Sequence, residues 1–157
     1  MATQKITSVS AGAVFVEWDP RYALGISLID EQHQELIRLT NELYNSCLLG
    51  DDLLKDAFSR AVKGTVDYVK YHFSAEEKLL ENARYPDLEG HKKLHAAFVK
   101  QILDDVINFE TGKKFVPNTF VRFLKDWILS HIAVEDKKYA EYIFSRKKQG
   151  ESNNYHA

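Results

Sequence analysis

Apolar residues recur every three or four positions through most of this chain, and this period restricts its fold more than any other feature. Such spacing places apolar side chains along one face of an α-helix. No stretch alternates convincingly between polar and apolar residues over the length of a strand. Proline and glycine fall mostly between the periodic segments, where they end helices or form turns. The pattern predicts an all-α protein with four helices.

The first helix is expected to start near Asp30, a good N-cap residue, and to end near Gly50. The second spans about 51–83, and the third runs from between residues 86 and 90 to near 112. The fourth begins at Pro117, because the first turn of a helix does not need the missing N–H. Its inward stripe is predicted to contain Phe120, Leu124, Trp127, His131 and Val134.

The short links between these helices favour an antiparallel up-down-up-down four-helix bundle over about residues 30–146. Residues 1–30 show no helical period and are predicted to form an extended N-terminal arm. The apolar period is lost toward the C-terminus, so a frayed tail is expected over about 147–157. A chain of 157 residues is treated as one domain, residues 1–157.

Composition excludes several classes of partner. A net charge of -2 gives no electrostatic reason to expect nucleic acid or an anionic membrane surface as a partner. The longest apolar run near the N-terminus, "AGAVFV", is too short to cross a membrane and is weak as a signal-peptide core. Cys47 is the only cysteine, so no internal disulfide forms, which suits a reducing compartment. We therefore expect a cytoplasmic protein.

The predicted buried stripes contain residues that a hydrophobic core disfavours. Five of the six histidines fall at inward positions, and they come from all four helices. One such histidine is more often a hydrogen-bonded core residue than a ligand. Five of them are better explained by a metal centre, because every buried polar group needs a partner. With two carboxylates, the candidate ligands are His33, His72, Glu76, His91, His95, His131 and Asp136.

The number of donor groups restricts the kind of metal. Five imidazoles and two carboxylates are too many for one zinc ion, which is usually four-coordinate, and they suit two larger ions with shared carboxylates. The segment "HKKLH" lacks the glutamate of the H-E-x-x-H zinc protease motif. A ferritin-like di-iron site needs Glu-x-x-His pairs, and no histidine here has a glutamate three residues before it.

The order and spacing of the candidate ligands resemble those of the hemerythrin family, especially its bacterial single-domain members. His33 is followed in turn by "HFSAE", "HKKLH" and "HIAVED", which contain the other six residues. The segments "LGISLIDEQHQEL", "YPDLEGH" and "WILSHIAVEDKKY" add similarity around these positions. The resemblance covers about residues 17–144, which is nearly the whole predicted bundle.

The resemblance implies a centre of two iron ions joined by a bridging oxide or hydroxide. One iron would be bound by the three histidines of the third and fourth helices, and the other by His33 and His72. Glu76 and Asp136 would bridge the two ions. The first iron then has six ligands and the second has five, so dioxygen would bind to the iron that carries His33 and His72.

The resemblance also implies an apolar pocket that keeps water away from the bound gas. Five residues are candidates for the lining of this pocket, and each could equally be an ordinary core residue. Trp127 is the strongest candidate because it precedes His131 by one turn. The five candidates are Leu36, Phe73, Trp127, Ile128 and Ile132.

Three details of spacing concern neighbours of the ligands. Glu77 points about 100° away from Glu76 on a helix, so we expect it to be solvated surface. Tyr139 lies three residues after Asp136 and either contacts the site or only packs. His131 and Asp136 would lie about 140° apart on a regular helix. Either the helix widens there into a π-bulge, or the metal centre reaches around its side.

The leading functional hypothesis is a non-enzymatic protein that binds dioxygen reversibly, as a carrier, store or sensor. Imidazoles neutralise high-valent iron less than carboxylates do, so a histidine-rich centre should activate oxygen less readily. The alternatives are a di-iron redox enzyme that consumes peroxide or nitric oxide, and a metal-storage bundle. Dioxygen is the expected partner, and no sequence feature identifies a protein partner.

Overall fold

The computed structural model describes residues 14–49 and 51–154. In this part of the chain the structure is helical, with connecting turns and no strand. The elements in chain order are the 3₁₀-helix η1 (Pro20–Tyr22), the α-helices α1 (Ser27–Cys47), α2 (Asp51–Asn82), α3 (Leu88–Glu110) and α4 (Pro117–His131), the π-helix η2 (Ile132–Asp136) and the α-helix α5 (Lys137–Asn154).

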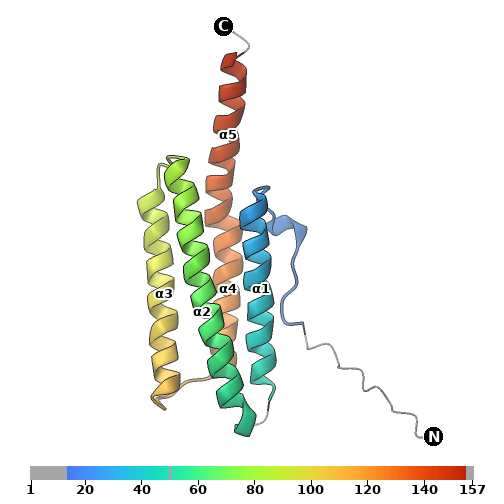
Figure 1. The fold of residues 1–157 in the computed structure, drawn as a ribbon, viewed down its shortest axis with the longest axis vertical. Helices are drawn as coiled ribbons and strands as arrows, with labels where there is room; N and C mark the ends of the chain where they lie inside the picture. The colour runs from blue at the N-terminus through green and yellow to red at the C-terminus, as the bar shows by residue number, and fades with distance from the viewer. Residues whose placement is uncertain (1–13, 50, 155–157) are drawn as a thin grey trace, which may run out of the picture.

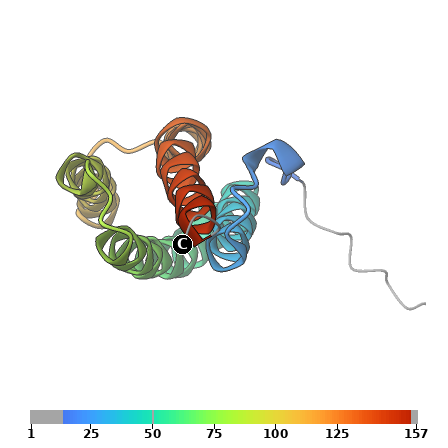
Figure 2. The same ribbon diagram turned by 90° about the horizontal axis from the view of Figure 1, so that it is seen from above.

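The helices form an antiparallel up-down-up-down bundle, as the sequence predicts (Figure 1). α1 packs against α2 and α4, and α2 also packs against α3, so consecutive helices are mostly neighbours (Figure 2). Aromatic rings connect α3 to α4, where Phe98 stacks on Trp127 with ring centroids 3.8 Å apart. The described helices include none with the length and hydropathy that a membrane crossing requires.

The start of α1 differs from the prediction. The helix begins at Ser27, and Asp30 lies in its first turn instead of at its N-cap. The Asp30 carboxylate accepts hydrogen bonds from the backbone N–H groups of Leu24 (2.8 Å) and Gly25 (3.0 Å), so it fixes the turn before the helix. Gly25 has a φ of +82°, a conformation that glycine adopts without strain.

The segment before α1 lies along the outside of the bundle as the predicted arm, of which residues 1–13 fall outside the described part. Asn41 of α1 holds this arm. Its side-chain oxygen accepts hydrogen bonds from the N–H groups of Phe15 and Val16, both at 2.9 Å, and its amide donates to the Val16 carbonyl. The Phe15 ring stacks on Tyr44 at 4.4 Å. The arm is thus fixed to α1 by polar and aromatic contacts.

α4, η2 and α5 form one continuous rod, and α5 projects beyond the ends of the other helices (Figure 1). The helix continues to Asn154, past the predicted end near residue 146. Loss of the apolar period signals loss of packing partners, but Lys, Gln and Glu still favour helix. Val134 is exposed, and its predicted inward position is wrong because the π-turn changes the helical register at that point.

The apolar core is divided into two clusters by a layer of buried polar residues. Along α1, Ile29 belongs to one cluster and Leu36 to the other, with His33 between them. Along α2, Leu80 and Phe73 are separated in the same way by Glu76. The bundle therefore places its polar layer between two apolar clusters.

Candidate metal centre

All seven predicted ligands are buried and lie in this polar layer. α1 contributes one histidine, α2 a histidine and a glutamate, and α3 two histidines. The last histidine ends α4, and the aspartate ends η2. In chain order the residues are His33, His72, Glu76, His91, His95, His131 and Asp136.

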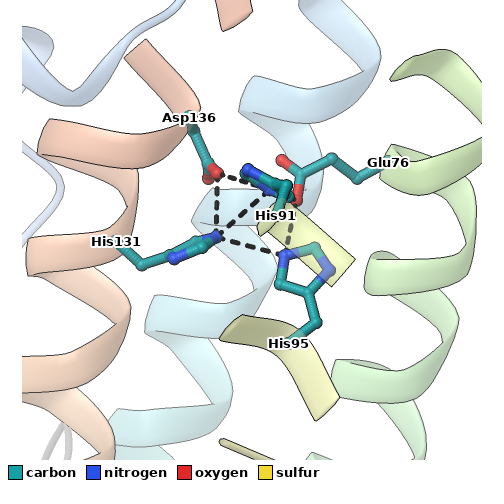
Figure 3. Close-up of side chains that lie close together, drawn as sticks. All are labelled: Glu76, His91, His95, His131 and Asp136. Carbon is teal, nitrogen blue, oxygen red and sulfur yellow. Dashed lines mark hydrogen bonds and ion pairs between the residues drawn. The ribbon is translucent and has the colours of Figure 1, made fainter. Parts of the chain in front are cut away.

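The donor atoms fall into two groups that share both carboxylates. One group consists of three histidines, Glu76 and Asp136, drawn in Figure 3, and the other combines the same two acids with His33 and His72. Within each group, one ligand atom from every residue lies within 4.8 Å of the others. This partition matches the assignment that the family resemblance implies.

The spacing of the residues along each helix explains why they converge. His72 and Glu76 lie four positions apart on α2, as do His91 and His95 on α3, so each pair shares a helix face. His131 and Asp136 are five apart, and the π-helix η2 lies between them. Because π-helical hydrogen bonds join residues five apart, this turn brings His131 Nε2 to 3.0 Å from Asp136 Oδ1. Of the two explanations left open by the sequence, the structure contains the π-bulge.

Several donor atoms converge on one another at hydrogen-bond distance. His131 Nε2 lies 3.1 Å from His95 Nε2 and 3.3 Å from His91 Nε2. Among the described residues, neither ring nitrogen of His33 and neither carboxylate oxygen of Asp136 makes a hydrogen bond, although His33 Nε2 lies 3.2 Å from Asp136 Oδ2. Buried polar atoms without partners are rare in proteins. A cation between these atoms would satisfy them together.

The charges of the site also fit a cation. Burial raises the pKa of Glu76, but hydrogen bonds from neighbouring histidines outweigh this effect and lower it to about 2. Burial also raises the pKa of Asp136, yet its histidine neighbours outweigh this effect and hold its pKa well below the ordinary value. Burial lowers the pKa of His72 to about 4. The carboxylates are therefore ionised and His72 is neutral at pH 7, which are the states that metal binding requires. Burial lowers the pKa of His91, but its contacts with the carboxylates of Asp136 and Glu76 outweigh this effect and raise it to about 9, so His91 would lose a proton when it binds a metal.

Hydrogen bonds with residues outside the predicted ligand set orient His72 and Glu76, and a third such bond orients His95. Gln32 Oε1 lies 2.8 Å from His72 Nδ1, and the Tyr139 hydroxyl donates to Glu76 Oε1 at 2.5 Å. Of the two roles left open for Tyr139, the structure therefore gives it a polar contact with the site. No sequence pattern distinguished Gln32 from the other polar residues around His33.

Glu77 also contacts the site, which corrects its predicted role as solvated surface. Its side chain is only 28% exposed, and its Oε1 lies 2.9 Å from His95 Nδ1. The Cβ atom does point away from the Glu76 face, as expected. However, α3 packs on that side of α2, and the long glutamate side chain reaches the histidine.

The predicted pocket residues are buried or half-buried members of one apolar cluster. Phe73 stacks on His95 with ring centroids 3.6 Å apart, and Trp127 stacks on His131 at 4.4 Å. Both rings thus cover histidines of the three-histidine group. Trp127, which precedes His131 by one turn, thus contacts that histidine, and its place in a gas pocket stays a prediction. Leu36, Ile128 and Ile132 remain candidates for the pocket wall.

Comparisons with known proteins agree with this geometry. Residues 24–143 match the family model described as the hemerythrin HHE cation binding domain. The chain is 29% identical over 132 residues to a bacteriohemerythrin of Stenotrophomonas maltophilia, covering 84% of each chain. It is 33% identical to a hemerythrin-like protein of Naegleria gruberi, covering 78% of this chain and 88% of that one. A crystal structure of wild-type hemerythrin aligns with a TM-score of 0.75 and 26% identity, over 81% of this chain and 96% of the other.

Proposed function

Because the chain belongs to the hemerythrin family, we propose that it binds dioxygen reversibly at a centre of two iron ions. The observation that carries this proposal is the pair of donor groups with shared Glu76 and Asp136. Two ions bridged by two carboxylates would use all seven buried side chains. They would also satisfy the atoms of His33 and Asp136 that make no hydrogen bond.

The two groups would hold the two irons unequally. The group with His91, His95 and His131 supplies three nitrogens, and the group with His33 and His72 supplies two. If both carboxylates and a bridging oxide or hydroxide were shared, one iron would have six ligands and the other five. Bound iron supplies the reversible electron transfer that dioxygen binding needs. The ligand count leaves room for the gas on the side of His33 and His72.

The surrounding residues keep the site ordered and dry. Gln32 and Glu77 accept hydrogen bonds from the Nδ1 atoms of His72 and His95, which leaves the opposite Nε2 atoms to bind metal. The apolar clusters on either side of the ligand layer exclude water while admitting a small neutral gas. Exclusion of water and protons favours release of the gas unchanged.

One observation favours the alternative, a redox enzyme that consumes peroxide or nitric oxide. A groove of about 840 Å³ between α2 and α3 is lined in part by Glu77 and His95. Solvent in this groove reaches the Glu77 carboxylate, and a carboxylate bonded to a ligand histidine is a route for protons. Proton delivery is required for peroxide turnover but not for reversible gas binding.

Optical titration separates the two functions. Iron-loaded protein is cycled between oxygen and argon, and for a carrier its absorption bands should appear and disappear over repeated cycles. His33→Ala should abolish the bands, because it removes a ligand of the iron that binds the gas. His156→Ala, the same change at a histidine that is not a predicted ligand, should leave them unchanged. Irreversible oxidation in the first cycle, with turnover of added peroxide or nitric oxide, would establish the enzyme instead.

A further inference from the structure

A second pocket, of about 610 Å³, lies between the C-terminal end of α2 and the middle of α5. None of its lining residues belongs to the candidate metal centre. We propose that this pocket binds a small organic phosphate, meaning a phosphate monoester attached to an apolar group. This inference goes beyond the proposed oxygen binding and does not depend on it.

All of the charged side chains that line the pocket are positive. Arg84, Arg146 and Lys147 line it, and no acidic side chain does so among the residues that the structure describes. Each of four other pockets on the molecule includes at least one acidic residue. The whole chain has a net charge of -2, so the positive charge here is a local feature. Such a pocket attracts an anion.

The three cations are not neutralised by described acidic residues, although Lys147 Nζ lies 5.6 Å from the centroid of the Phe144 ring. Within residues 14–49 and 51–154, none of them forms an ion pair with a carboxylate. Arg146 donates one hydrogen bond to the Tyr142 hydroxyl at 2.7 Å, and that hydroxyl donates to the Arg84 carbonyl at 2.9 Å. A guanidinium has five N–H donors, so most of those on Arg146 remain free. Tyr142 therefore orients the Arg146 guanidinium without neutralising it.

The backbone of Arg84 is strained, which makes arginine at this position unexpected. Arg84 has a φ of +55°, in the left-handed region that favours glycine. It follows α2 in a helix-ending turn, where its N–H bonds to the Glu81 carbonyl and the Tyr85 N–H bonds to the Leu80 carbonyl. Glycine is the usual residue there. A side chain that binds an anion gives arginine a function that glycine lacks.

The remaining lining suits the rest of such a ligand. Leu79 and Ile143 belong to the margin of an apolar cluster and form an apolar wall beside the three cations. The volume lies within the usual range for small-molecule sites. A phosphate monoester carries between one and two negative charges near pH 7, and arginine binds its oxygens in a bidentate manner. Three positive charges therefore match a phosphate better than a single carboxylate.

The rival explanation is that these cations only stabilise the negative C-terminal end of the α2 dipole. Binding measurements on the full-length protein as purified separate the two. In calorimetric titrations, 1-naphthyl phosphate should bind at one site per chain with a dissociation constant below about 1 mM. Inorganic phosphate and 1-naphthol, which each lack one half of the ligand, should bind at least about tenfold more weakly.

Two adjacent lysines provide a matched pair of variants. Lys147 lines this pocket, whereas Lys148 lines a different pocket beside Leu24. Lys147→Gln should weaken binding at least about tenfold, the loss expected for one charge-assisted hydrogen bond, and Lys148→Gln less than about twofold. Arg84→Gly should weaken binding by a similar factor. Its unfolding temperature should stay equal or rise, because glycine relieves the strained backbone.

Three results would overturn the proposal. The first is no detectable binding of 1-naphthyl phosphate at about 5 mM, well above the expected dissociation constant. The second is equal weakening by Lys147→Gln and Lys148→Gln, which would indicate attraction to the general charge of α5. The third is equal binding of 1-naphthol, which would show that the phosphate is not recognised.

Discussion

At the scale of single residues, the predicted ligands depend on neighbours that hold them in one orientation. Tyr139 is fully buried and donates a hydrogen bond to Glu76, one of the two acids that both donor groups share. A buried carboxylate that loses such a donor keeps its desolvation cost without compensation. The Tyr139 hydroxyl should therefore contribute to stability even without metal.

We expect Tyr139→Phe to lower the free energy of unfolding by about 1.5–3 kcal/mol, as for a hydrogen bond to a charged group. Urea denaturation of the metal-free protein measures this directly, since metal release then makes no contribution. Tyr71→Phe is the control, because Tyr71 is exposed and its loss of a hydroxyl should cost less than about 0.5 kcal/mol. Equal costs for the two variants would argue against a stabilising role for the Tyr139 contact.

The residue scale also shows what sequence patterns can predict. Six of the seven predicted ligands were expected to be buried from helical periodicity, because the period determines which way a Cβ atom points, whereas Asp136 was included because it follows His131. Gln32 and Glu77 were not predicted as ligand neighbours, because their contacts depend on how adjacent helices approach. Side-chain reach across a helix interface is a tertiary property, and local spacing contains no information about it.

At the scale of secondary structure, the π-turn η2 is the element on which the site depends. It inserts one extra residue between His131 and Asp136, so that the buried residues of α4 before the turn and of α5 after it both face the core. After the turn, α5 presents the buried Tyr139 and Ala140 to the second apolar cluster. The sequence spacing of five indicated this turn, but it also allowed a shifted metal centre.

The length of this turn predicts that a deletion within it is tolerated better than an insertion. Deletion of the exposed Ala133 should produce a regular α-helix with the aspartate four residues after His131, which is the spacing of the other two pairs. Insertion of an alanine after Ala133 should instead rotate α5 by about 100° and remove the aspartate from the site. Thermal unfolding and iron content should therefore be affected far more by the insertion. Equal damage from both changes would contradict this account of the π-turn.

Helix ends were predicted less well than helix interiors. Pro117 marks the start of α4 correctly, because proline fits only the first turn of a helix. Asp30 was wrongly expected to cap α1, since an aspartate can serve the preceding loop as well as the helix. The extension of α5 to Asn154 escaped prediction because apolar periodicity reports burial and not helix formation as such.

At the scale of the whole molecule, the fold brings four helices together around a layer of buried polar residues that an ordinary hydrophobic core does not contain. Two buried carboxylates and five imidazoles lie between two apolar clusters. Buried charges are costly unless they are paired, so bound cations should stabilise this layer. The bundle topology could be predicted from short links, and the central layer from the histidines. The pocket beside α5 could not, because it combines residues from distant segments.

The central claim is that this layer holds two irons, and elemental analysis of purified protein loaded anaerobically with ferrous salt tests it most directly. We expect two iron atoms per chain, one for each donor group, with visible bands that develop on exposure to oxygen. A protein that contains a single zinc ion, or that remains free of iron and colourless in air after loading, would contradict the claim.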